Sequence, residues 1–137
     1  MLKIKKMAIV TDKIELNNNH LPDGKFQLNT KITRNIGKIS ENVFFTQLSV
    51  EIKNEDNFKF PINLSVVIKG IFDFEEAMNE LEVNAFLKHQ AVNILYPYIR
   101  SMVTSTTTNA MMAPVVLPII DAIHLFPEDK SVNHLVS

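Results

Sequence analysis

The chain has 137 residues, with 14 basic and 15 acidic side chains, a net charge of −1 and no cysteine. This length suits one domain with a hydrophobic core, so we expect a single domain over residues 1–137 with a polar tail from about residue 127. The balanced charge gives no bulk electrostatic reason to expect nucleic acid or an anionic membrane as a partner. The lack of cysteine excludes a disulfide framework and cysteine zinc sites, and favours a reducing compartment, the cytoplasm.

The N-terminal residues include lysines but no unbroken apolar stretch of the kind found in secretion signals. No run approaches the roughly 18 apolar residues that a membrane-spanning helix requires. We therefore expect neither a cleaved export signal nor insertion into a membrane.

Apolar and polar residues alternate through the first half of the chain, which is typical of strands with one buried face. The alternation predicts strands over residues 2–16, 26–33, 44–53 and 58–75. In the first of these the even positions, from Leu2 to Leu16, are expected to face the core. The last strand is expected to have Pro61 near its start, and Gly70 at a bulge or a close backbone approach.

Short turns are expected at residues 21–24 and 54–57, and a polar connector at residues 35–41, so that neighbouring strands pair antiparallel. Such a sheet is apolar on one face and polar on the other. Its apolar face needs a cover, which the second half of the chain must supply. The expected fold class is therefore α+β, a four-stranded antiparallel sheet with helices packed on one face.

After residue 74 the apolar residues recur at spacings of three and four, which is typical of helices. A short helix is expected within residues 75–89 and an amphipathic helix over residues 93–103. Asn93 would cap this second helix and place Pro97 in its first turn, whereas a helix that began upstream would be kinked at Pro97. The expected apolar stripe consists of Ile94, Leu95, Tyr98, Ile99, Met102 and Val103.

A threonine tract within residues 104–109 is expected to end this helix. Threonine loses side-chain freedom in a helix, and its hydroxyl competes for backbone groups. Pro114 and Pro118 then bracket a segment that is expected to be extended. Pro118 also suits the first turn of a last helix, expected over residues 119–126.

The sequence contains no pattern that indicates catalysis or metal binding. The four histidines are scattered, and none stands three or four residues from another, the spacing that places two ligands on one helix face. The acidic residues Glu75, Glu76, Glu80 and Glu82 are typical of a solvated helix start rather than of an acid–base pair. A glycine-rich phosphate loop and a nucleophile elbow are both missing. We therefore expect a protein that is not an enzyme and uses no metal or cofactor.

Aromatic and methionine side chains are concentrated in the second half instead. Any one of them is suited to the core, but methionine is flexible and polarizable and is frequent on surfaces that bind varied partners. Met102 on the predicted helix, and the pair Met111 and Met112 after the threonine tract, are candidates for such a surface.

Three motifs of the second half resemble the SecB protein-export chaperone family. Residues 93–103, NILYPYIRSMV, are similar to the family's Asn-Ile-Leu-Phe-Pro-Tyr-Ala-Arg signature. Residues 69–74, KGIFDF, resemble the end of its last strand, and residues 111–121, MMAPVVLPIID, resemble the apolar loop that leads into its last helix. The specific resemblance covers about residues 69–126.

The resemblance implies a four-stranded antiparallel sheet in each protomer and a dimer of dimers whose long helices lie between the sheets. It implies ATP-independent holding of unfolded or slowly folding polypeptides, often preproteins delivered to the SecA motor. In the family, clients lie in apolar grooves lined by aromatic residues of the strand end, the crossover connector and the main helix. The client-binding positions implied here are Phe72, Phe74, Tyr96, Tyr98, Met111 and Met112. Met102 is a further candidate, because methionine is flexible and polarizable.

The exposed positions of the sheet depart from the family pattern. Family members that hand clients to SecA carry acidic residues there, whereas lysines dominate in this chain, and its last helix opens with Ile-Ile-Asp. A chaperone dedicated to one client, such as an antitoxin, therefore stays open as an alternative. So does a carrier of a small apolar ligand held between sheet and helices.

Overall fold

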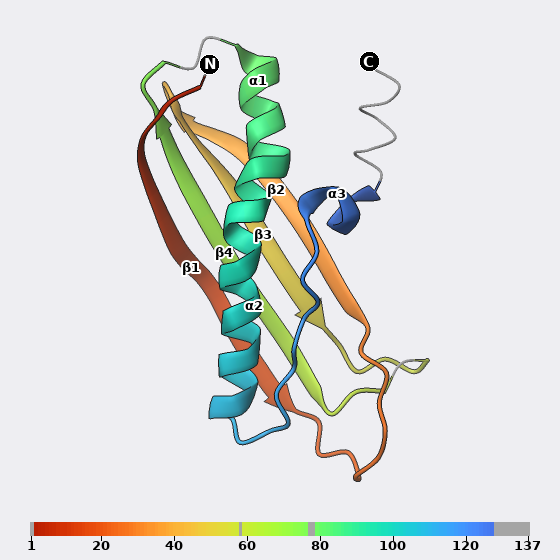
Figure 1. The fold of residues 1–137 in the computed structure, drawn as a ribbon. Coiled ribbons are helices and arrows are strands. Elements are labelled where there is room, and N and C mark those ends of the chain that lie inside the picture. Colours follow the sequence, from red (N-terminus) through yellow and green to blue (C-terminus); the bar gives the residue numbers. More distant parts are fainter. Residues whose placement is uncertain (1, 58, 77–78, 128–137) are drawn as a thin grey trace.

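The computed structural model describes residues 2–57, 59–76 and 79–127. The described chain runs from strands into a column of helices, followed by an extended segment and a short helix (Figure 1). The strands are β1 (Ile4–Asn18), β2 (Thr30–Ser40), β3 (Val43–Ile52) and β4 (Ile62–Phe74). The helical elements are α1 (Glu80–Ala85), the π-helical turn η1 (Phe86–Gln90), α2 (Ala91–Asn109) and α3 (Ala122–Leu125). The change from strands to helices thus follows the change in residue spacing.

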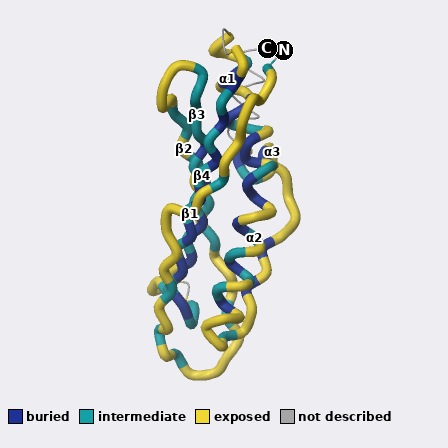
Figure 2. The backbone as a smooth tube through the Cα atoms, turned by 90° about the vertical axis from the view of Figure 1, so that its left-hand side faces the viewer, coloured by how far each residue is buried: buried dark blue, intermediate teal, exposed yellow. Residues whose placement is uncertain are grey.

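The strands form one antiparallel sheet in the order β1-β4-β3-β2. The helices and the extended segment lie on a single face of this sheet (Figure 1). In the side view, buried positions gather between the two layers (Figure 2). This is the predicted α+β fold, and it supplies the cover that a sheet with one apolar face requires.

In β4 the sequence pattern and the burial agree along the whole strand. Its residues alternate between buried and half-buried, and Val66 and Ile68 are fully buried. The strand begins directly after Pro61, as predicted, because proline cannot donate to the ladder. Gly70 lies at no register shift, but a Cβ there would stand 3.0 Å from Leu95 Cδ2 of α2. Gly70 is therefore not at a bulge, and the group that approaches its backbone closely is the Leu95 side chain of α2.

The side chains of β1 do not follow the predicted parity. Pairing of β1 with β4 shifts register twice, just before Lys6 and just before Lys13. Each shift inserts one extra residue and turns the following side chains to the opposite face. Ile9 consequently packs against the core, whereas Val10 lies opposite Lys69 on the outer face. The prediction that even positions face the core is therefore wrong between the two shifts.

Two boundaries of β2 differ from the prediction. The strand begins at Thr30 rather than residue 26, because its partner β3 ends at Ile52, opposite Thr30, and no described strand lies beyond that point to pair with it. At the other end β2 continues through the expected connector to Ser40. The hairpin turns at Asn42, which has a φ of 65°, a conformation that asparagine tolerates better than most residues.

α1, η1 and α2 form one continuous column (Figure 1). Asn93 and Pro97 therefore lie inside the helix, and the expectation that Asn93 caps it is wrong. The expected fraying at the threonine tract is also wrong, since α2 reaches Asn109. The hydroxyls of Thr107 and Thr108 donate to carbonyl oxygens one turn back, so they do not compete with the helix.

The last helix, α3, begins at Ala122 and not at residue 119. Asp121 caps it, because its carboxylate accepts a hydrogen bond from the backbone N–H of His124. Pro118 instead belongs to the extended segment that precedes the helix. The predicted tail from about residue 127 lies outside the described residues.

Candidate binding surface

Residues 110–121, here called the return segment, run back along α2 (Figure 1). A row of α2 side chains, spaced by three and four residues on one side of the helix, holds the backbone of this segment and of the first residue of α3. Asn93 Oδ1 accepts from Ala122 N–H (2.8 Å), the Tyr96 hydroxyl donates to Pro118 O (2.8 Å), Arg100 Nε donates to Leu117 O (3.0 Å), the Thr104 hydroxyl donates to Val115 O (2.8 Å), and Thr107 Oγ1 accepts from Val115 N–H (3.0 Å). These bonds along α2 fix the position of the segment.

The threonine tract has its explanation in this row. Thr107 is fully buried, and buried hydroxyls need hydrogen-bond partners. Its Oγ1 lies 3.0 Å from the carbonyl oxygens of Val103 and Thr104, to which it can donate, and it accepts from the N–H of Val115. The hydroxyl therefore satisfies both the helix and the segment packed against it.

The neighbouring tyrosines of α2 have opposite environments. Tyr96 is 2% exposed and donates to Pro118, whereas Tyr98 is 53% exposed. Burial raises the pKa of the Tyr96 phenol above its ordinary value, and the charge of Arg100 acts in the opposite direction. The predicted apolar stripe, which included Tyr98 and omitted Tyr96, is thus rotated relative to the buried face of α2.

The return segment also presents apolar side chains to solvent. Val115 and Leu117 pack into the core, while Val116 between them is 64% exposed. Met111 and Ile119 are 96% and 84% exposed. We call the exposed group the apolar ridge; it consists of Met111, Val116, Ile119 and Ile120 of the return segment and Ile123 of α3. Exposed apolar side chains that gather on a surface mark binding sites, so the ridge, within residues 111–123, is a candidate binding surface.

Of the predicted client-binding residues, Phe72, Phe74 and Tyr96 lie in the interior, each at most 2% exposed. Phe72 and Phe74 pack edge-on against Phe86, with ring centroids 5.1 and 5.5 Å away. Such pairs favour the folded core beyond the area they bury. A partner that met the molecule in this conformation would not contact these rings.

The remaining predicted positions are nearer the surface. Met102 and Met112 are partly buried against the core, and Tyr98 and Met111 are exposed. The structure therefore divides the predicted residues by exposure: three are in the interior, two are partly buried, and Tyr98 and Met111 are open to solvent.

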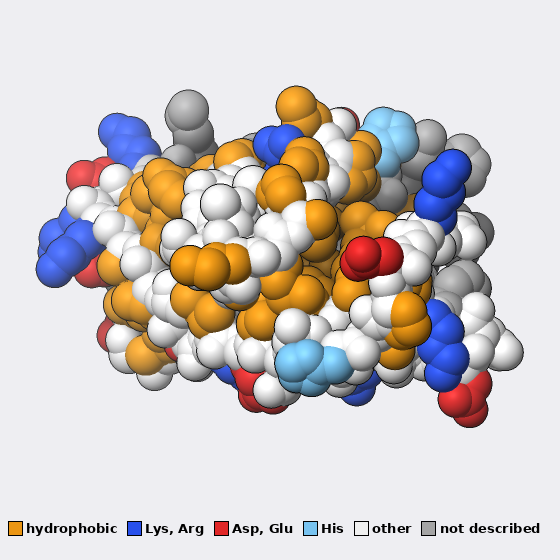
Figure 3. All heavy atoms as spheres, turned by 90° about the horizontal axis from the view of Figure 1, so that it is seen from below, with side chains coloured by type: hydrophobic (Ala, Val, Ile, Leu, Met, Phe, Trp, Pro, Cys, Tyr) orange, Lys and Arg blue, Asp and Glu red, His pale blue; other side chains and the backbone are white. Residues whose placement is uncertain are grey.

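Sequence reasoning overlooked an aromatic pair near the end of the molecule where α2 finishes. The rings of Phe26 and Phe60 meet edge to face, with centroids 6.3 Å apart, and Leu28 nearby in the chain is 37% exposed. Viewed from this end, apolar side chains occupy much of the middle and most charged ones lie toward the margins (Figure 3). Phe26 and Leu28 had the alternation of a strand, which concealed their position in a loop.

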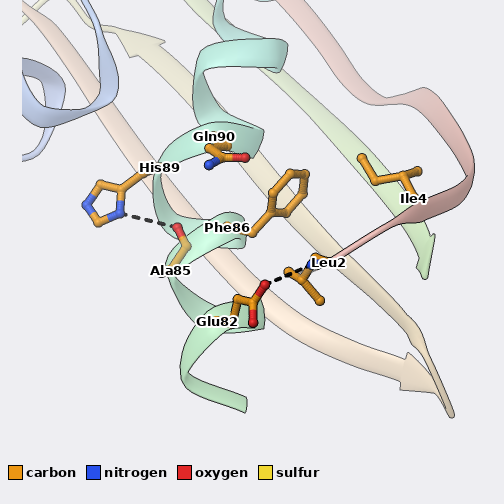
Figure 4. Close-up of a pocket in the computed structure, with 7 residues that line it drawn as sticks. All are labelled: Leu2, Ile4, Glu82, Ala85, Phe86, His89 and Gln90. Carbon is orange, nitrogen blue, oxygen red and sulfur yellow. Dashed lines mark hydrogen bonds between the residues drawn. The ribbon is translucent and has the colours of Figure 1, made fainter. Parts of the chain in front are cut away.

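A pocket of about 620 Å³ lies at the opposite end, between the start of β1 and the helical column (Figure 4). It is lined by Leu2, Ile4, Glu82, Ala85, Phe86, His89 and Gln90. The Glu82 carboxylate accepts a hydrogen bond of 2.8 Å from the Leu2 N–H, which joins the two walls. None of the predicted client-binding residues lines this pocket, so it is a separate feature from the ridge.

The π-helical turn η1 beside this pocket is held by side chains of the sheet. The buried Thr46 donates to the carbonyl of Leu87 (2.8 Å), and Arg34 donates to that of Lys88 (2.7 Å). The Arg34 guanidinium also lies 4.3 Å from the centre of the Phe126 ring, after α3. Arg34 thus connects β2, η1 and the C-terminal end of the described chain.

On the outer face of the sheet, acidic side chains are paired with lysines. The pairs are Asp12 with Lys69 (3.6 Å), Glu15 with Lys13 (3.6 Å) and Glu51 with Lys53 (3.0 Å). The hydrogen bond that Lys53 donates to the Glu51 carboxylate raises the pKa of Lys53. Exposed pairs of this kind contribute little to stability, but they neutralise the acidic charge of this face.

Potential metal ligands are dispersed over the described residues. No group of three or more histidine, aspartate or glutamate residues among them could bind a metal ion. The hydrogen bond with His124 lowers the pKa of Asp121, but this pair serves the cap of α3. No helix in the described part of the chain is long and apolar enough to cross a membrane.

Comparison with known proteins extends the resemblance beyond the second half. The family model described as preprotein translocase subunit SecB matches residues 8–133. An uncharacterized protein of Methanocaldococcus jannaschii is 35% identical over 118 residues, which cover 82% of this chain and 75% of that protein. Protein-export protein SecB of Orientia tsutsugamushi (strain Boryong) is 27% identical over 111 residues, which cover 80% of this chain and 69% of that protein.

A solved structure has a similar fold. It is the Mycobacterium tuberculosis SecB-like chaperone Rv1957, in complex with a ChAD peptide from the HigA1 antitoxin. The two chains superpose with a TM-score of 0.72 at 17% identity, over 88% of this chain and 91% of the other. The sequence match to the family model spans nearly the whole described chain, and the fold agrees with it. The chain therefore belongs to the SecB family.

Proposed function

We propose that this protein is an ATP-independent chaperone that holds unfolded polypeptides in the cytoplasm, and that it is not an enzyme. The apolar ridge is the observation that carries this proposal. A folded protein normally buries such side chains, yet here α2 holds the return segment, which displays most of them, by hydrogen bonds to its backbone. Membership of the SecB family supports the same conclusion.

The ridge has the chemistry that a broad holding surface needs. An unfolded chain presents apolar side chains in no fixed order, so contacts with it must be adaptable. Met111 is 96% exposed, and its flexible thioether can follow clients of different shape. Partial burial of one such side chain contributes about 1 to 2 kcal/mol, so several weak contacts give affinity without strong selectivity. Tyr98 on α2 and the partly buried Met102 and Met112 extend the proposed surface.

We further propose that the protein assembles as a dimer of dimers. β1 lies at an edge of the sheet and is followed there by no other described strand. Its apolar residues Ile4, Met7 and Ile14 are 42%, 43% and 52% exposed. A long apolar edge left in water favours pairing with another chain, and a second copy at this edge would cover these side chains.

An aggregation assay tests the proposed function. A chemically denatured protein is diluted into buffer without nucleotide, with and without this chain, and turbidity is followed. We expect suppression of turbidity and, by light scattering, the mass of a tetramer. A monomer that leaves aggregation unchanged would contradict the proposal. A hydrophobic dye displaced by lipid but not by unfolded peptide would indicate a ligand carrier instead, with the pocket at Leu2 and Phe86 as its site.

A chaperone dedicated to one client is the second candidate. The ion pairs of Asp12, Glu15 and Glu51 with lysines support this candidate. These pairs leave the outer face of the sheet without the acidic surface expected for docking to SecA. A SecB-like chaperone of similar fold is known in complex with an antitoxin peptide. Mass spectrometry of co-purified polypeptides separates the candidates: one dominant client indicates a dedicated chaperone, and many clients indicate a general one. A toxin and antitoxin pair encoded next to this gene would favour the former.

A further inference from the structure

The return segment has one backbone edge occupied by α2 and one edge open. Side chains of α2 bond to the N–H and C=O of Val115 and to the C=O of Leu117. In an extended chain, the polar groups of successive residues point to opposite edges. Those of Val116 therefore point away from α2. Within the described residues neither its N–H nor its C=O has a hydrogen-bond partner, and Val116 is 64% exposed.

Proline restricts the donors of this open edge to a single residue. Pro114 stands two residues before Val116, at a position whose N–H would face the same edge in an extended chain. At Pro118, two residues after Val116, the alternation ends, because the Pro118 C=O accepts a hydrogen bond from Tyr96 of α2. Neither proline has an N–H to donate. Prolines on exposed edges also hinder the unlimited pairing that leads to aggregation. The edge is therefore suited to one short bridge with another chain and not to a continuous ladder.

We propose that Val116 pairs with the backbone of the bound polypeptide: its N–H donates to a client carbonyl and its C=O accepts from a client N–H. The inference rests on the proposed chaperone function and assigns the recognition chemistry of that surface. An extended segment of another, unfolded chain fits the edge because a backbone bridge is independent of client sequence. Met111 and Ile119, exposed on either side of Val116, supply apolar contacts to the client's side chains.

Two substitutions at one position separate the backbone from the side chain. Val116→Pro removes the N–H and keeps an apolar side chain, whereas Val116→Ala keeps the N–H and shortens the side chain. The measurement is the dissociation constant of a fluorescently labelled unfolded peptide with the full-length protein. We expect Val116→Pro to weaken binding about five- to tenfold, the scale of one or more lost hydrogen bonds. Val116→Ala should weaken it only about twofold.

Equal affinities of the two variants would overturn backbone pairing and leave the chaperone proposal intact. A wild-type protein that binds no unfolded peptide would instead overturn the chaperone proposal itself. A fall in oligomer mass for Val116→Pro, with peptide affinity unchanged, would show that a second copy of this chain occupies the edge, which also contradicts the inference.

Hydrogen exchange of the wild-type protein supplies a test that does not depend on the folding of a variant. The Val116 amide has no partner among the residues that the structure describes and should exchange rapidly in the free protein. We expect its exchange to slow when the unfolded peptide is saturating, while the Val115 amide, already bonded to Thr107, changes less. Unchanged exchange at Val116 in the complex would overturn the inference.

Discussion

α2 and the return segment cover the same face of the sheet by different means. α2 buries Leu95, Ile99 and Val103 completely and is held mainly by apolar contact. The return segment buries Val115 and Leu117 but depends on hydrogen bonds from α2 for its position. A segment fixed through its backbone does not need all of its own side chains for packing. This difference explains how α2 can stabilise the fold while the return segment leaves apolar side chains available to a partner.

The largest effect should separate the buried helix from the exposed ridge. Leu95→Ala removes a fully buried side chain that lies close to Gly70, and should lower the free energy of unfolding by about 3 kcal/mol. Ile119→Ala shortens a side chain that is 84% exposed, so it should change the free energy of unfolding by less than about 0.5 kcal/mol. Urea denaturation measures both. Similar losses for the two variants would mean that the ridge is part of the core.

The hydrogen bonds between α2 and the return segment should have the next largest effect. Thr107→Val keeps the shape of the side chain but removes the acceptor of the buried Val115 N–H, so we expect a loss of about 2 kcal/mol in unfolding free energy. Thr108→Val is the matched control, because the Thr108 hydroxyl is exposed and bonds only within the helix. If both variants lose equally, the hydrogen bond to the return segment contributes nothing specific.

Client affinity should depend on the exposed residues of both elements. Tyr98→Ala combined with Met111→Ser removes one apolar anchor from α2 and one from the return segment, and should weaken binding of an unfolded peptide by about 1 to 2 kcal/mol. Isothermal titration measures the affinity, and light scattering checks that assembly is intact. Unchanged affinity in an intact oligomer would remove these two residues from the proposed surface.

The smallest effect concerns the two tyrosines. Tyr96→Phe loses the bond to Pro118 and should lower the unfolding free energy by about 1 kcal/mol at neutral pH. Because the folded state raises the pKa of Tyr96 above its unfolded value of about 10, its contribution is complete below that pH and is lost as pH rises through the folded-state pKa. The wild type should therefore lose more stability than Tyr96→Phe between neutral pH and about pH 11.

Tyr98→Phe is the control for the loss of a tyrosine hydroxyl from α2. Tyr98 is 53% exposed, so its replacement should change the unfolding free energy at neutral pH by less than about 0.5 kcal/mol. Thermal unfolding at a series of pH values measures all three proteins. A Tyr96→Phe variant whose alkaline profile matched that of the wild type would show that another group controls it.

Prediction from sequence succeeded where local pattern and tertiary environment agree. β4 is central in the sheet, so its alternation translates directly into burial, and Pro61 precedes it as expected. It was wrong for β1, because a register shift depends on the partner strand and not on the strand's own composition. It was also wrong for the threonine tract, since intrinsic propensity is overridden when a hydroxyl such as that of Thr107 acquires a tertiary partner.

Periodicity and adjacent motifs were sufficient to specify a one-sided antiparallel sheet, a helical second half and the SecB family, because those signals lie between residues that are neighbours in the chain. They could not specify which tyrosine of α2 points inward or which edge of the return segment is open. These properties depend on bonds between distant residues, such as Tyr96 with Pro118 and Thr107 with Val115. Only the packing of the chain against itself brings such partners together, and it thereby separates the residues that hold the fold from those left at the surface.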